Sequence, residues 1–310
     1  MAKFVKWVEA GPDELLEDVA VRSLDSRLQP VMHYMPLAAK HPERDIENVH
    51  QMRVWARRAT AAMTLYKELL PRRRRKWINS QLKAIRRAAN DARDDDVFAQ
   101  RLADDTQHAA AARPLLDKVR RHRQDSQRPI VELWKDLFEL GRFPRRCVKL
   151  LRKVRLRGEA ADAGPVRFGP WAESQIQPVM DSFFAAAGAD LSDVGAMHRF
   201  RIAGKKLRYA VELLAPAFGE SLRTQAYPAM QNLQEWLGKI NDLAAAQARL
   251  KRWLEQAKGS EQAAYLQEML SQEQQRLEER RSEFLTWWNA GRKAELRQLL
   301  ALQPLIPANT

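Results

Sequence analysis

The sequence has a single cysteine, Cys147, and no apolar run of the roughly 20 residues that a membrane-spanning helix requires. One cysteine excludes a disulfide within the chain, which suits a reducing compartment. The first residues include lysines but no apolar segment of the kind found in secretion signals, and the chain turns acidic where a cleavage site would stand. From these absences we expect no membrane span and a cytoplasmic location.

The sequence also lacks any sustained alternation of apolar and polar residues, which is the pattern of a half-buried β-strand. Apolar residues recur instead at steps of three and four, as in Met52, Trp55, Ala59, Ala62 and Tyr66. This spacing predicts one apolar stripe along a helix. The predicted fold class is therefore all-α, built from helical bundles.

Helix-breaking residues divide the chain. We expect the first helix to be limited by Pro30 and Pro36, because proline disrupts a helix interior. Residues 157–171 combine glycines, prolines and small residues, which predicts a linker. The predicted organisation is an N-terminal bundle over residues 12–156 and a C-terminal bundle over residues 172–303.

Acidic residues are scarce where basic residues gather. The chain has 53 Lys and Arg against 39 Asp and Glu, a formal net charge of +14. Residues 50–94 hold 13 basic and 3 acidic residues, and residues 113–157 hold 15 and 5, whereas residues 1–49 hold 6 and 9. A cationic field concentrated in this way predicts a polyanionic partner, either nucleic acid, an anionic membrane surface or a phosphate polymer.

The segment from His50 to Asp94 has a degraded copy 148 positions later, without a gap. A histidine, three cations and an aspartate in one register over this length indicate an internal duplication. We therefore expect two pseudo-symmetric antiparallel bundles around a basic central cavity. The matched pairs are His50 and His198, Arg53 and Arg201, Arg57 and Lys205, Arg58 and Lys206, and Asp94 and Asp242.

The matched cations form a column on each helix. His50, Arg53 and Arg57 fall at i, i+3 and i+7, so their side chains project along one face. The second copy repeats this spacing and adds a cation at Arg208, where the first copy has Thr60. Arginine suits phosphate because its planar guanidinium donates two hydrogen bonds at once, so phosphate is the predicted ligand class.

The paired strings VHQMRVWARR and MHRFRIAGKKLRYAVELL, followed by ARDDDVF and LGKINDLAAA, resemble the two halves of a CHAD domain, the conserved histidine α-helical domain. The resemblance implies helical bundles around a basic cavity that binds inorganic polyphosphate, with some members sited at polyphosphate granules. Many relatives carry a triphosphatase-type β-barrel domain before it. No strand-rich region precedes the motif here, so the resemblance implies a stand-alone form that is not an enzyme.

The candidate polyphosphate-binding residues are cations and histidines on or beside the two columns, with three more on the helix after the first column. No cofactor and no metal site is predicted, because neither histidine has a ligand partner at metal-binding spacing on its own helix. The candidates are His50, Arg53, Arg57, Arg58, Lys83, Arg86, Arg87, His198, Arg201, Lys205, Lys206 and Arg208.

Two other functions stay open at this point. One is nucleic-acid binding, which the basic charge suggests, although no helix-turn-helix, zinc-knuckle or aromatic sheet motif is present. The other is a phosphatase or phosphotransferase that uses His50 or His198. Those histidines could equally be structural. For Asp94 and Asp242 we favour a structural role, as a helix cap or an ion-pair partner of a basic residue, over metal binding.

Overall fold

The computed structural model describes residues 4–41, 46–104, 109–156, 164–257 and 259–301. These residues are almost entirely helical, and the only extended pairing among them is a single bridge between Leu15 and Arg167. The predicted all-α class is confirmed. No helix in the described ranges combines the length and apolar character needed to cross a membrane.

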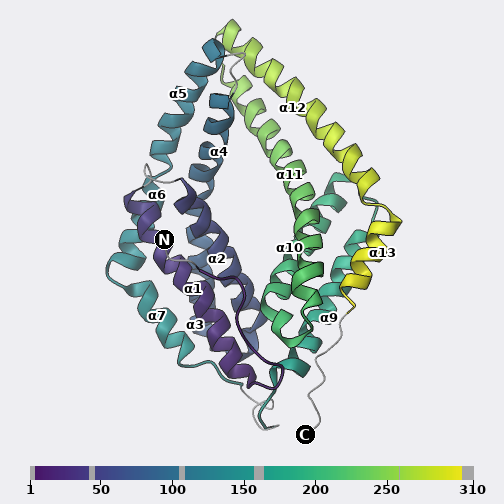
Figure 1. The fold of residues 1–310 in the computed structure, drawn as a ribbon. Coiled ribbons are helices and arrows are strands. Elements are labelled where there is room, and N and C mark those ends of the chain that lie inside the picture. The colour runs from purple at the N-terminus through teal and green to yellow at the C-terminus, as the bar shows by residue number, and fades with distance from the viewer. Residues whose placement is uncertain (1–3, 42–45, 105–108, 157–163, 258, 302–310) are drawn as a thin grey trace.

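Figure 1 shows the helices in two groups on opposite sides of an open, diamond-shaped frame. The first group is α1 (Leu16–Lys40), α2 (Glu47–Leu65), α3 (Arg72–Ala88), α4 (Asn90–Asp104), α5 (Ala109–Asp125), α6 (Arg128–Trp134) and α7 (Arg142–Leu151), with a short 3-10 helix at Lys67–Leu69 and a π-helical segment at Lys135–Glu139. The second group is α9 (Phe168–Ala187), α10 (Val194–Leu214), α11 (Tyr227–Glu255), α12 (Ser260–Trp287) and α13 (Ala290–Leu299), with a short 3-10 helix at Ala215–Ala217 and a π-helical segment at Leu222–Ala226.

The apolar stripes predicted for the repeated helices are buried. Met52 and Trp55 in α2 and Tyr66 directly after it are at most 4% exposed, and in α10, Phe200 and Leu207 are fully buried. Removal of this apolar surface from water is the main force that fixes each helix against its neighbours. The remaining face of each helix, which carries the predicted cationic column, is therefore left outside the core.

The two groups touch at both ends of the frame. At one end α2 packs on α10 and α1 on α9, within a core that runs through both groups. At the other end the tip of α4 and α5 meets α11 and α12 around a separate cluster that includes Phe98, Leu115, Val119, Leu250 and Leu266. Contact at the two ends leaves the middle of the frame open to polar side chains.

The first helix differs from its prediction. α1 continues through Pro30 and Pro36 as far as Lys40, so the limit placed at these prolines was wrong. Beyond the first proline, Val31 and Met35 are fully buried. Tertiary packing of this kind overrides the weak local propensity that the prediction used.

The predicted linker, residues 157–171, is only partly described, because residues 157–163 lie outside the described ranges, as does the predicted end at 303. Its last residues already belong to α9. They are held close to the amino-terminal segment, where the Gly169 amide donates to the Pro12 carbonyl at 2.8 Å. A Cβ at Gly169 would stand 2.9 Å from Cβ of Pro12, so this approach requires glycine. The division into two domains and the duplication remain predictions.

Candidate functional site

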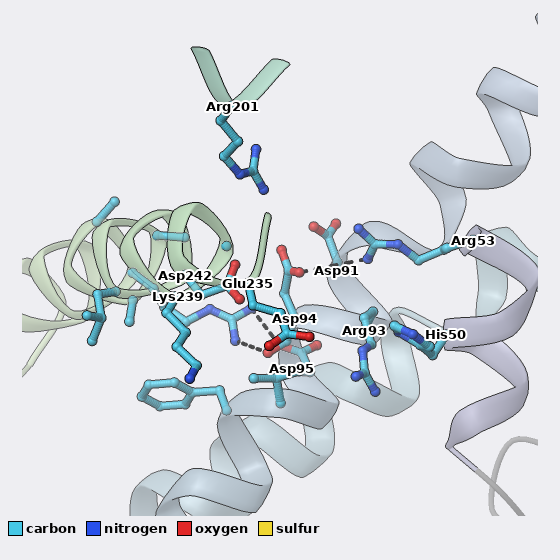
Figure 2. Close-up of a pocket in the computed structure, with 18 of the residues that line it drawn as sticks. His50, Arg53, Asp91, Arg93, Asp94, Asp95, Arg201, Glu235, Lys239 and Asp242 are labelled. Carbon is cyan, nitrogen blue, oxygen red and sulfur yellow. Dashed lines mark hydrogen bonds and ion pairs between the residues drawn. The ribbon is translucent and has the colours of Figure 1, made fainter. Parts of the chain in front are cut away.

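A cavity of about 1490 Å³ lies between the two helix groups. Its walls come from α2, α4 and α5 on one side and from α10, α11 and α12 on the other. Figure 2 shows Arg53 and Arg201 entering this space from different helices. Residues about 150 positions apart in the sequence therefore share one polar space.

The cavity wall carries both signs of charge. Twelve lysines and arginines line it, together with seven carboxylates, so its formal net charge is +5. Asp91, Asp94, Glu235 and Asp242 lie on α4 and α11 and are exposed. An anion entering the cavity thus meets an excess of cations but must avoid a group of carboxylates.

Six of the twelve predicted site residues line the cavity: His50, Arg53, Arg57, Arg201, Lys205 and Arg208. They come from the matched columns on α2 and α10, whose apolar stripes are buried in the core. Helix periodicity fixes this result, because residues at i, i+3 and i+7 share the face opposite the buried stripe.

Arg53 is held by the end of a neighbouring helix. Its Nη1 donates to the carbonyl oxygens of Ala89 at 3.1 Å and Asn90 at 3.2 Å, and lies 3.8 Å from Oδ1 of Asp94. Cations are favourable at such carbonyl-rich helix ends. Arg53 is thus partly neutralised, and Asp94 makes the ion pair expected of it.

Arg57, Arg201 and Lys205 make no direct hydrogen bond or ion pair with any described residue. Burial, reinforced by Arg201, Arg57 and Arg208, lowers the pKa of Lys205 to about 8. Burial also lowers the pKa of Arg201, where Asp242 opposes the shift and Arg57 adds to it. Neighbouring cations that depress one another in this way are short of negative charge, which an anionic ligand would supply.

Arg208 lines the cavity but already has a carboxylate partner. Its Nη1 donates to Oε1 of Glu212 at 2.8 Å and to the Tyr227 hydroxyl at 3.0 Å. Tyr227 donates to the same carboxylate, and Arg58 reaches it from α2 at 2.9 Å. Glu212 is therefore the centre of a buried network that joins the two groups.

The other six predicted residues lie outside the cavity wall: Arg58, Lys83, Arg86, Arg87, His198 and Lys206. Arg58 is turned to Glu212, and His198 and Lys206 are exposed on α10. Lys83 and Arg87 are exposed on α3, and Arg86 is half-buried beside them. The structure thus separates residues that the shared register had grouped.

Sequence reasoning missed a second group of cavity residues near the tip, namely Arg93, Lys118, His122, Arg249 and Arg252. The buried carboxylate of Asp95 organises part of this group, accepting from Arg249 at 2.9 Å and from Ser126 at 3.2 Å, with His122 Nδ1 at 2.6 Å. The dense acidic run Asp94 to Asp96 was the only sequence signal. Lys118, His122 and Arg252 have no basic counterpart at the 148-residue offset. Arg249 does match Arg101, but this pair lies beyond the repeated segment from His50 to Asp94, so the repeat did not identify it.

The surroundings of the cavity histidine, His50, disfavour its charged form. Burial, followed by the field of Arg93, lowers its pKa, which keeps the imidazole neutral at neutral pH. Among the described residues, no three His, Cys, Asp or Glu side chains are arranged to hold a metal ion. The cations next to His50 are thus the stronger candidates for contact with an anion.

Comparison with solved structures shows proteins of similar fold. The CHAD domain of the plant Ricinus communis superposes with a TM-score of 0.72 at 23% sequence identity, covering 96% of each chain. PptA from Streptomyces chartreusis superposes with a TM-score of 0.61 at 18% identity, covering 89% of this chain and 99% of that one. At these identities the likeness is one of fold. No curated protein matches the chain.

The family model of the CHAD domain matches residues 23–251, which is most of the chain and includes both cationic columns. This match confirms the resemblance inferred from the repeated motif. The chain belongs to the CHAD domain family.

Proposed function

We propose that the protein binds inorganic polyphosphate in the cavity between its two helix groups, and that it does so without catalysing a reaction on it. One observation carries this proposal. Arg57 from one group and Arg201 and Lys205 from the other line one cavity, lie within one another's electrostatic reach, and lack direct partners among the described residues. Such a site is electrostatically incomplete until an anion occupies it.

The remaining cavity cations extend this contact. Arg53 and Arg208 are oriented by Asp94 and Glu212, so they can offer their other guanidinium N–H groups to a ligand at little entropic cost. Guanidinium groups bind phosphate oxygens in a bidentate manner. A chain that carries about one charge per phosphate would therefore be held by several such contacts and by counterion release.

The carboxylates of the wall favour a thin ligand over a broad one. Asp91, Asp94, Glu235 and Asp242 would repel a wide polyanion that filled the whole cavity. A flexible single chain can follow the unpaired cations and leave these carboxylates in water. This selectivity distinguishes polyphosphate from duplex nucleic acid, the main rival.

The test is a titration with polyphosphates of graded length, using neighbouring lysines as a matched pair. Lys205→Gln removes a cavity cation, whereas Lys206→Gln removes an exposed cation from the next position on the same helix. We expect long chains to bind far more tightly than orthophosphate, and only Lys205→Gln to weaken them. Equal affinity for orthophosphate and long chains, or equal effects of the two variants, would contradict the proposal.

Two further measurements separate the rivals. Displacement of bound polyphosphate by duplex DNA at equal phosphate concentration would favour nucleic acid. Release of phosphate, or formation of phosphohistidine in the presence of divalent metal, would favour an enzyme. Association with polyphosphate granules is part of the proposal, and a fluorescent fusion that stays diffuse in cells containing granules would contradict it.

A further inference from the structure

α3 and α7 together carry a second concentration of positive charge outside the cavity wall. The α3 sequence RRRRKWINSQLKAIRRA has eight lysines and arginines and no acidic residue. The α7 sequence RFPRRCVKLL has four and again no acidic residue. Charged helix faces are common, but they normally mix both signs, because like charges at i and i+4 destabilise a helix.

The start of α3 is unfavourable for its own helix. Arg72 to Arg75 occupy the first turn, where the helix dipole is positive, and no acidic residue is present there. These cations therefore do not stabilise α3 locally. A role toward an external anion would account for their presence at this position.

The two helices form one continuous surface. α3 contacts α7, and Trp77 of α3 meets Phe143 of α7 with ring centroids 6.2 Å apart. The guanidinium of Arg146 lies 4.2 Å from the Trp77 ring centre, which fixes an α7 cation beside α3. Lys83 and Arg87 on α3 and Lys149 on α7 are exposed.

The helical register connects this surface to the cavity. Lys76, Lys83 and Arg87 fall at i, i+7 and i+11, so they form an exposed stripe about 16 Å long on α3. Trp77 and α7 lie along one edge of the stripe. Along the other edge lies Arg86. Burial lowers the pKa of Arg86, and the nearby charges of Arg57 and Arg87 add to this shift.

Arg86 thus stands between a cavity cation and the exposed stripe. Its Nε is buried and has no hydrogen-bond acceptor in the described part of the chain. A series of cations therefore leads from Arg57 on α2 past Arg86 on α3 to Lys149 on α7. Neither α3 nor α7 contains an acidic residue.

We propose that this surface, which we call the outer track (Lys76, Lys83, Arg86, Arg87, Arg146 and Lys149), binds the part of a long polyphosphate chain that extends beyond the cavity. The inference rests on the proposed function and adds a second contact region, which makes affinity depend on chain length. Short chains occupy the cavity alone, and longer chains gain affinity by following the outer track. Continuity with the cavity favours a flexible single polymer over a duplex or a lipid surface, which would need to approach α3 and α7 independently.

The experiment compares a track variant, Lys83→Gln with Arg87→Gln and Lys149→Gln, with a control variant, Arg199→Gln with Lys206→Gln and Lys251→Gln. All six residues are exposed, so both variants lose the same charge with little effect on folding, which circular dichroism and thermal melting check. Each is titrated with polyphosphates of increasing length, with duplex DNA and with phosphatidylglycerol vesicles.

For long chains we expect the track variant to lose affinity on the order of tenfold and to lower the slope of log affinity against log salt by about 2, since three contacts disappear. Short chains should bind the track variant, the control variant and the wild type alike. An unchanged long-chain affinity in the track variant, or an equal loss in the control, overturns the outer track. A track variant that loses affinity only for duplex DNA or only for vesicles would also overturn the outer track.

The cavity variant Lys205→Gln keeps the two proposals distinguishable. If Lys205→Gln lowers the affinity for short chains while the track variant keeps the wild-type affinity for long chains, only the outer-track proposal fails. If Lys205→Gln does not change the affinity for short chains, the cavity proposal fails, and the outer-track proposal loses its basis.

Discussion

The side chain of Arg58 on α2 lies against Glu212 on α10, with Nε of the arginine 2.9 Å from Oε2 of the carboxylate. The two residues are 154 positions apart, and the glutamate side chain is 1% exposed. This contact fastens the two helix groups at one end of the cavity. It also turns Arg58 away from the space that the adjacent Arg57 faces.

Loss of the Glu212 carboxylate should destabilise the protein. Glu212→Ala leaves Arg58 and Arg208 without their shared acceptor, and breaking a buried pair of this kind costs about 3–5 kcal/mol. Chemical denaturation measures the change. Glu220→Ala is the control, because its ion pair with Arg223 is exposed and should contribute less than about 1 kcal/mol. Similar losses in the two variants would contradict the role given to Glu212.

Substitution of Arg57 should weaken ligand binding, whereas substitution of Arg58 should weaken the fold. Arg57→Gln removes an unpaired cavity cation, so polyphosphate affinity should fall by roughly tenfold while stability stays near wild type. Arg58→Gln should lower stability by more than about 1 kcal/mol and change affinity little. Calorimetric titration and denaturation of both variants check this, and the reverse assignment of effects would refute it.

Polyphosphate affinity should fall as pH rises through about 8, the pKa to which burial and neighbouring cations lower Lys205. Below this pKa Lys205 is charged and attracts the ligand, and above it binding must first take up a proton. The logarithm of the affinity should therefore decrease by up to about one unit per pH unit. Lys205→Arg keeps its charge throughout and should flatten the profile. An unchanged profile in this variant would rule out Lys205 as the titrating group.

Two neighbouring carboxylates should behave differently. Asp95→Ala removes the buried acceptor of Arg249, His122 and Ser126, so stability should fall by about 3 kcal/mol. Hydrogen exchange should quicken most in α4, α5 and α11, which meet there. Asp91→Asn removes an exposed negative charge from the cavity, so it should leave stability within about 0.5 kcal/mol and strengthen polyphosphate binding. Weaker binding by Asp91→Asn would argue against an anionic ligand.

Cys147 should be unreactive in the folded protein. Burial raises the pKa of its thiol well above the ordinary value, and the side chain is 1% exposed. A thiol reagent should therefore modify the native protein slowly and the denatured protein quickly, with one equivalent consumed. Rapid modification under native conditions would show that the packing of α7 against the core opens readily.

Much of the fold could be predicted, because periodic burial leaves a strong signal. The stripes through Trp55 and Phe200 became core, and the columns with Arg53 and Arg201, except for His198, became cavity wall. The prediction failed at Pro30, where packing of residues far away in sequence outweighed the local cost of a proline. It also missed Asp95 and Arg249, whose pairing depends on two helix tips that meet only in the folded chain.

The sequence by itself determined the helices, the cationic excess and the two matched columns, because these depend on residue type and on a spacing of 3.6 residues per turn. Only the tertiary structure decided which cations remain unpaired. Arg57 and Arg58 are adjacent and chemically identical, but about 100° of helix rotation separates their side chains. One faces an open cavity, and the other meets a carboxylate supplied by a distant helix.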